Sequence, residues 1–235
     1  MLPYFFHPAD LLMIPALLFA LWAQMKVHGA YARYSRVATR SGLTGRDIAE
    51  EVLRNAGVGN VRIGRVPGEM TDHYNPATRE LNLSDGVYHS NSVAALGIAA
   101  HEAGHAIQHA RAYAPMQLRQ MVYPISSIGS MAAFPLILLG VIFGPMGGAW
   151  LINLGIWMFS AAVMFTLITL PVEFDASRRA VLALAQGGYL TQEEMKGVKA
   201  VLRAAALTYV AAAAAAILQL LRLLLIFGGL GRSNE

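Results

Sequence analysis

The chain has 235 residues, of which 56% are hydrophobic and only 14% are charged. Soluble domains carry charged residues at ~25% of positions, so this composition indicates a membrane protein. The net charge of +4 is too small to indicate a nucleic-acid partner, and we predict none. The chain has no cysteine, so a disulfide framework is excluded, and any metal must be held by histidine and carboxylate side chains.

Four apolar segments are long enough to cross a bilayer, and they predict an α-helical membrane protein with four transmembrane helices. They are residues 11–25, 121–144, 149–170 and 204–227. The first is short and contains Pro15. A cleaved signal peptide is the alternative for it, but no Lys or Arg precedes it and positive charge follows it. The fourth contains Arg222 near its end, where a long side chain can reach the membrane interface.

The charge pattern predicts the orientation of these spans. Lys and Arg are concentrated in residues 26–118 and 172–203, whereas the loop between the second and third spans, around residues 145–148, carries no charge. The positive-inside rule therefore places both charged segments in the cytoplasm and both termini outside. The predicted organisation is an N-terminal transmembrane helix (1–25), a cytoplasmic α+β segment (26–118), a transmembrane hairpin (119–171), a cytoplasmic helical segment (172–203), and a C-terminal transmembrane helix with its tail (204–235).

The two charged segments also predict local structure. A capping box at Thr44 and Asp47 opens a helix at about 45–56. Strand-like runs follow at 61–66 and 79–84, with a polar loop at 72–76 between them. The second run is either an edge strand that pairs with an extended substrate or an ordinary sheet strand. Next comes a helix at about 91–111. The second charged segment predicts a helix at about 172–186 and, after a capping box at 191–194, a helix that runs into the fourth span.

The run His101-Glu102-Ala103-Gly104-His105 reads HExxH within an apolar helical stretch. Helix positions i and i+4 share a face about 6 Å apart along the axis, so both imidazoles can bind one Zn²⁺ at ~2.0–2.1 Å. Glu102 lies beside the first histidine, where it can hold and deprotonate a zinc-bound water. Buried His and Glu need partners, and a metal supplies one. The motif predicts a zinc hydrolase, and peptidase is the class we favour.

A catalytic zinc needs three protein ligands and one open position. His109 lies two turns, ~12 Å, from the first motif histidine and cannot reach the same ion, so we expect it on the flank of the helix or beside the ligands. Glu173 is favoured as the third ligand because it follows the third span on the predicted cytoplasmic side. Asp175 is the alternative. On a helix it points ~200° away from Glu173, and we expect it to pair with Arg178 or Arg179.

Several runs together resemble the YugP-type neutral zinc metallopeptidases of bacterial membranes. The runs are HYNP at 73–76, LSDGVYH at 83–89, SVAALGIAAHEAGHAIQHA at 92–110 and PVEFDASRRA at 171–180. The chain is similar, more distantly, to the HtpX-type membrane proteases, which are gluzincins. The resemblance implies a gluzincin-like α+β metallopeptidase core on the cytoplasmic side of the bacterial inner membrane. It implies His101, His105 and Glu173 as ligands of one Zn²⁺ per chain, and Glu102 as the general base.

One position departs from the gluzincin pattern. That pattern usually has an aspartate four residues after the ligand glutamate, where it orients the first zinc histidine. This chain has Ser177 there. The resemblance therefore implies that Ser177 or Asp175 takes over the orienting role.

We expect a membrane-bound zinc endopeptidase that hydrolyses peptide bonds with a zinc-activated water and Glu102 as general base. Its substrates would be peptides or proteins, membrane proteins among them, and the lipid bilayer would be its other partner. The alternative is a noncatalytic, zinc-stabilised membrane scaffold or adaptor. A metal transporter is disfavoured, because it would need ionisable residues near the midplane and the second and third spans have none.

The predicted orientation can be tested by single-cysteine labelling, since the chain has no native cysteine. Arg40→Cys and Lys196→Cys should react with a membrane-impermeant maleimide only from the cytoplasmic side, and Gly147→Cys only from the outside. Ala213→Cys, inside the fourth span, is the unlabelled control. Labelling of positions 40 and 196 from opposite sides would contradict the topology.

Overall fold

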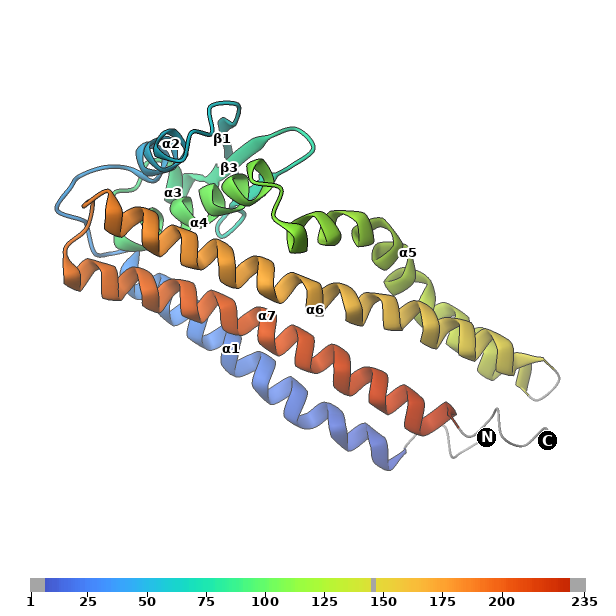
Figure 1. The fold of residues 1–235 in the computed structure, drawn as a ribbon. Coiled ribbons are helices and arrows are strands. Elements are labelled where there is room, and N and C mark those ends of the chain that lie inside the picture. Colours follow the sequence, from blue (N-terminus) through green and yellow to red (C-terminus); the bar gives the residue numbers. More distant parts are fainter. Residues whose placement is uncertain (1–6, 145–146, 229–235) are drawn as a thin grey trace. The chain divides into compact units, whose positions relative to one another are not determined.

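A computed structural model describes residues 7–144 and 147–228, most of which are helical (Figure 1). Its elements, in chain order, are the 3₁₀ helix η2 (Pro8–Leu12), α1 (Met13–Tyr34), α2 (Gly45–Asn55), β1 (Arg62–Val66), β2 (His73–Asn75), β3 (Glu80–Ser84), α3 (Asp85–Tyr88), α4 (Val93–Ala110), α5 (Ala114–Phe143), α6 (Gly148–Gln186) and α7 (Gln192–Phe227).

The chain divides into two compact units. The helical unit consists of the residues up to Trp22, Leu118–Leu170 and the residues from Tyr209 onward. The α+β unit consists of Ala23–Gln117 and Pro171–Thr208. The assignment of segments to membrane and cytoplasm stays a prediction.

Four helices in the described part of the chain are long and apolar enough to cross a membrane, which confirms the four predicted apolar helices. They are Pro8–Tyr34, Ala114–Phe143, Gly148–Gln186 and Gln192–Phe227. Pro15 does not interrupt the first of them. It is the third residue of α1, and the N–H groups of a first turn have no partner within the helix. The predicted uncharged loop between the second and third spans includes residues 145–146, which lie outside the described residues.

Glycines bring α5 and α6 close together inside the helical unit. A Cβ atom at Gly129 would lie 2.7 Å from the Met158 carbonyl oxygen, and one at Gly155 would lie 2.7 Å from that of Ala133. Such contacts exclude any larger residue, as is typical of helices that pack in lipid. A cluster from α5, α6 and α7 completes the packing: Ile137, Ile152, Ile156, Leu223 and Phe227.

Arg222 is paired inside the helical unit. Its Nε atom donates to Asp10 Oδ1 at 2.5 Å, and its guanidinium also lies 3.5 Å from the side-chain oxygen of Gln219. The aspartate comes from η2, at the other end of the sequence. An opposite charge stabilises an arginine in an apolar helix, so reaching the interface is not its only means of stabilisation.

The predicted helix starts of the α+β unit are confirmed. Thr44 accepts a hydrogen bond from the backbone N–H of Asp47, and the Asp47 carboxylate accepts one from the N–H of Thr44. Thr191 and Glu194 form the same reciprocal pair at the start of α7. The helix predicted at 172–186 is the last part of α6, which is continuous from Gly148, and α7 runs without a break into the fourth apolar segment.

The sheet differs from the prediction. It has three strands in the order β1-β3-β2, with β1 parallel and β2 antiparallel to β3. The polar stretch at 72–76, predicted as a loop, contains β2. The run at 79–84 is therefore the central strand, and the hypothesis that it is an edge strand for substrate is wrong. Both of its edges are already hydrogen bonded to neighbouring strands.

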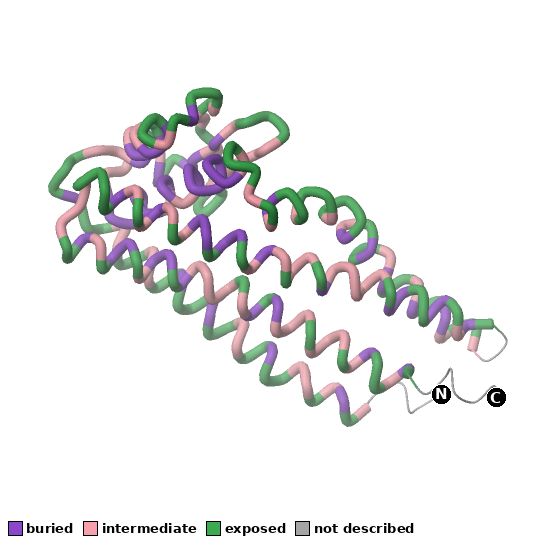
Figure 2. Tube along the Cα trace, in the orientation of Figure 1, coloured by how far each residue is buried: buried purple, intermediate pink, exposed green. Residues whose placement is uncertain are grey.

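Helix α4 lies at the centre of the α+β unit (Figure 1). Leu96 and the alanines at positions 99, 100 and 103 are fully buried, and Figure 2 shows the concentration of buried residues along this helix. They pack with buried side chains from α2, β3, α3, α6 and α7. The apolar stretch around HExxH is therefore core, and it fixes the helix that carries the motif.

Candidate metal centre

The HExxH motif lies in the middle of α4. Ser92 caps the helix by accepting a hydrogen bond from the N–H of Ala95. His101 and His105 then project from the same side, one turn apart. Their ring centroids are 4.7 Å apart and the rings are nearly perpendicular, at 83°. Both imidazoles are thereby directed to one place, as the i, i+4 spacing predicts.

Glu173 on α6 meets these two histidines. Its Oε2 atom lies 3.3 Å from His101 Nε2 and 3.5 Å from His105 Nε2. Among the described residues, these three make up the group of His and carboxylate side chains that could hold a metal ion, with all ligand atoms within 4.8 Å of one another. All three belong to the α+β unit.

The spacing of these atoms fits zinc. Two atoms that each lie ~2.0–2.1 Å from a tetrahedral zinc are ~3.3–3.4 Å apart, which is close to both nitrogen–oxygen distances in this cluster. Two imidazoles and one carboxylate are also ligand types that zinc prefers. The Glu173 side chain is only 3% exposed, and a buried carboxylate requires a cation or hydrogen-bond donors around it.

Gly104 allows the two helices to come close enough for this contact. A Cβ atom at this position would lie 2.7 Å from the Ala176 carbonyl oxygen on α6. Real side chains do not tolerate so short a distance, so any other residue here would push α6 away from α4. Glycine therefore brings the glutamate within reach of the two histidines.

The second ring nitrogen of each histidine also has a partner. His101 Nδ1 lies 3.1 Å from Ser177 Oγ, and His105 Nδ1 lies 3.0 Å from Gln108 Oε1. Ser177 occupies the position at which the gluzincin pattern has aspartate. The resemblance implied that Ser177 or Asp175 orients the first histidine, and of these two Ser177 is the one in contact with it. Such contacts fix the orientation of a metal-binding imidazole.

Gln108 defines which nitrogen of His105 carries the proton. Its Nε2 atom donates to the Val172 carbonyl at 2.8 Å and to Asp175 Oδ2 at 3.0 Å, and the residue is fully buried. An amide nitrogen has two hydrogens, and both are used by these acceptors. The amide oxygen must therefore accept the Nδ1–H of His105, and in the neutral imidazole the lone pair is then on Nε2, the nitrogen nearer to Glu173.

Asp175 has the role predicted as the alternative to metal binding. It accepts hydrogen bonds from Arg178 at 2.8 Å and from Arg179 at 2.5 Å, in addition to the bond from Gln108. Burial alone would raise the pKa of Asp175. The hydrogen bonds together outweigh burial, so its pKa lies below the usual value. Asp175 thus supports His105 indirectly, through Gln108.

Glu102, the predicted general base, is buried next to the first histidine. Sequence reasoning did not find Asp72, which lies in the loop before β2. Burial raises the pKa of Asp72, hydrogen bonds from Ser84 lower it, and the Glu102 charge raises it again, so the net shift is upward.

Burial lowers the pKa of His105, but the Glu173 and Glu102 carboxylates outweigh this and raise it. The negative charge around the motif therefore favours a bound cation.

His109 is not one of the three clustered residues, in agreement with the prediction from distance. Its Nδ1 atom lies 2.8 Å from the Tyr74 hydroxyl on β2. This tyrosine had no role in the sequence prediction, because β2 itself was not predicted.

The fold and the cluster define a class of protein, with four long apolar helices and a His-His-Glu group that could hold a metal ion. The model of the family described as "putative neutral zinc metallopeptidase" matches residues 9–228, and the chain belongs to this family. It is also 44% identical over 216 residues to the "Putative membrane protease YugP" of Bacillus subtilis (strain 168), covering 92% of this chain and 95% of that protein. No solved structure matches it.

The contact at Gly104 generates a prediction. Gly104→Ala should lower both zinc content and the melting temperature, because the new methyl group meets the Ala176 carbonyl and overpacking costs about 1–3 kcal/mol. Elemental analysis and thermal unfolding of the detergent-solubilised protein measure the two effects. Gly29→Ala is the matched control, since a Cβ there meets no described atom within 4 Å and alanine favours a helix. Equal zinc content and melting temperature in the two variants would contradict the proposed role.

Proposed function

We propose that the chain is a membrane-embedded zinc endopeptidase with a gluzincin-like core. One Zn²⁺ per chain is held by His101, His105 and Glu173, and Glu102 is the general base. The family described above and the name of the Bacillus subtilis relative support this class of activity. The observation that carries the proposal is the convergence of the three side chains at distances that suit zinc.

The second contacts of the ligands are compatible with a metal at this site. Gln108 accepts the Nδ1–H of His105, so the neutral imidazole carries its lone pair on Nε2, the atom that lies 3.5 Å from Glu173. A metal needs this lone pair, and a buried amide with all its partners holds the ring in the orientation that presents it.

Hydrolysis requires a polarised carbonyl and an activated water, and zinc supplies both when it is bound. The side chains do the rest. Glu102 accepts the proton of the attacking water and returns it to the amine that leaves. Asp72 lies close enough for the Glu102 charge to act on it, so a second carboxyl group stands near the proposed base.

The membrane setting follows from the apolar helices. We infer that they cross the bacterial inner membrane and that the α+β unit faces the cytoplasm, as the positive-inside rule predicts. Glu173 follows the third apolar segment after two residues of the same helix, α6. This arrangement favours substrates at or near the membrane, namely membrane proteins or their juxtamembrane segments.

The ligand assignment predicts the zinc content of variants. His101→Ala and Glu173→Ala should lose most of the roughly one equivalent per chain expected for wild type, because each removes one of three ligands. Asp175→Asn should keep more zinc, since Asp175 reaches His105 only through Gln108. His109→Ala is the control and should keep all of it. Retention of zinc by Glu173→Ala, together with its loss in Asp175→Asn, would show that the assignment is wrong.

The role of Glu102 predicts a separation of binding from catalysis. Glu102→Gln should keep its zinc and its fold but lose hydrolysis of a casein-type substrate by about 10²–10⁴-fold, because the amide cannot accept the proton of water. Glu50→Gln, an exposed change on α2, controls for the loss of one carboxylate.

The same experiment tests the alternative. A noncatalytic zinc-stabilised scaffold would bind zinc in both proteins and would cleave nothing in either. Peptidase activity in Glu102→Gln comparable to that of the wild type would exclude the proposed mechanism.

A further inference from the structure

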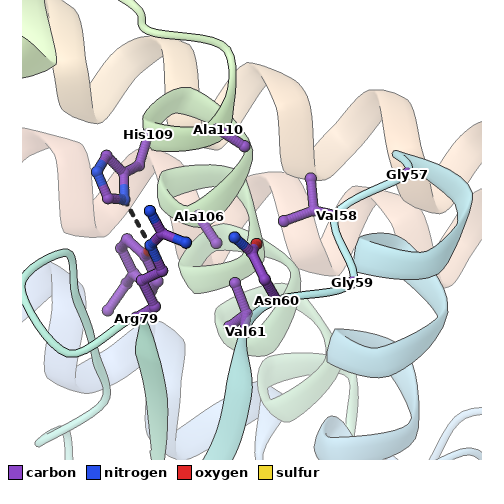
Figure 3. Close-up of a pocket in the computed structure, with 10 residues that line it drawn as sticks. Gly57, Val58, Gly59, Asn60, Val61, Arg79, Ala106, His109 and Ala110 are labelled. Atoms are coloured by element: carbon purple, nitrogen blue, oxygen red, sulfur yellow. Dashed lines mark hydrogen bonds between the residues drawn. The ribbon is translucent and has the colours of Figure 1, made fainter.

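A cavity lies in the α+β unit and is lined by residues other than the three of the candidate metal centre (Figure 3). It has a volume of about 570 Å³, within the ~300–1,000 Å³ range typical of ligand pockets. Its floor is apolar, with Val58, Val61 and Ala106. Its polar groups are the side chains of Asn60, Arg79 and His109. Tyr74 also lines it and is hydrogen bonded to His109.

The charge of this pocket is positive. Arg79 is exposed at its rim, and none of the described lining residues carries a carboxylate. The adjacent carboxylate in the sequence, Glu80, is held by Arg62 and by the Thr78 hydroxyl. Arg79 and His109 both line the pocket; burial lowers the pKa of His109, and the charge of Arg79 lowers it further. A second cation, Arg111, bonds the Ala56 carbonyl just before the pocket loop.

The backbone of Arg79 is unusual. Its φ angle is +55°, in the left-handed region that glycine and asparagine adopt more readily. Its carbonyl accepts a hydrogen bond from Arg62 N–H at 3.0 Å, which anchors the turn between β2 and β3. A bulky residue at a strained position of this kind suggests that its side chain is needed there.

The pocket lies on the same face of α4 as the predicted general base. Glu102, Ala106 and His109 fall within ~60° of one another around the helix, and His109 is ~10.5 Å beyond Glu102 along the axis. An extended peptide advances ~3.3–3.6 Å per residue, so this distance corresponds to about three residues of substrate.

We propose that this pocket is a specificity subsite that binds a carboxylate of the substrate, about three residues from the scissile bond. The inference rests on the proposed peptidase function and adds a substrate class to it. Arg79 binds the carboxylate in its planar fork, and Asn60 adds a hydrogen-bond donor. The apolar floor accommodates the aliphatic part of the same residue. The carboxylate comes from an acidic side chain or from the C-terminus of the peptide.

The test uses the full-length, zinc-loaded protein and fluorogenic peptides that have a single cleavage site. Glutamate replaces glutamine at each of the second to fourth positions on either side of that site. A second set ends at the second, third or fourth position after that site, as a free acid or as an amide. Glutamate or the free acid should lower KM about five- to tenfold at one position, as expected for a partly exposed guanidinium–carboxylate contact. The peptide set that shows the effect identifies the source of the carboxylate.

Arg79→Asn removes the charge at a position where asparagine tolerates the backbone conformation. The ratio of KM values for the neutral and acidic peptides should then fall to about one. Arg46→Gln, a charge-matched control at an exposed position of α2 outside the pocket, should keep the preference. The proposal is overturned if wild type shows no preference at any position, or if Arg79→Asn keeps it.

A binding measurement separates this proposal from the peptidase function. Fluorescence anisotropy of the same peptides on the Glu102→Gln protein reports affinity without turnover. Tighter binding of the acidic peptide that is lost in the Glu102→Gln, Arg79→Asn double variant supports the subsite even if wild type cleaves no peptide. Equal binding of acidic and neutral peptides overturns it, whatever the outcome of the cleavage assay.

Discussion

The contact between α4 and α6 at Gly104 determines whether the metal centre can form. The two histidines lie on one helix and the glutamate on another, and the backbones must approach within the space that a single methyl group would fill. The resulting distances from Glu173 Oε2, 3.3 and 3.5 Å, suit a shared ion. The position of Glu173, the proposed third ligand, therefore depends on a glycine that has no side chain to bind a metal.

Polar groups stabilise the same helix contact. Gln108 is fully buried on α4, yet its side chain makes three hydrogen bonds, two of them to α6. A buried amide left unpaired would cost about 1–3 kcal/mol, so these bonds favour the one arrangement of the helices that satisfies them. That arrangement also orients His105. Ser177, also on α6, contacts His101, so the second ring nitrogen of each histidine has a partner.

Local sequence patterns predicted much of the fold. Capping boxes at Thr44 and Thr191 gave correct helix starts, and apolar length gave the four long helices. Strand β2 was missed because it has only three residues, and polar side chains around a Pro-containing stretch resemble a loop. Its pairing with β3 is a long-range property that local pattern does not contain.

The candidate site was partly predictable for the same reason. The HExxH spacing is local, so His101 and His105 could be placed on one helix face. Glu173 required the further argument that two charged segments share one side of the membrane. Gln108 was not identified, because its partners at Val172 and Asp175 are more than 60 residues away in sequence. The only local signal was its position three residues after His105, on the same face of the helix.

Helix α4 also connects the proposed metal site to the proposed substrate pocket. Its 3.6-residue period places Gly104, His105 and Gln108 toward α6, while Glu102, Ala106 and His109 are centred ~120° around the axis, where His109 meets Tyr74 of β2. One helix thus carries the proposed ligands on one face and the proposed base and pocket wall on a neighbouring face. The distance from the general base to the pocket wall at His109 is then set by the rise of this helix. Arg79 lies instead on the turn between β2 and β3, and the Tyr74–His109 contact joins β2 to the helix. The substrate residue that the proposed pocket selects therefore depends on this contact between sheet and helix.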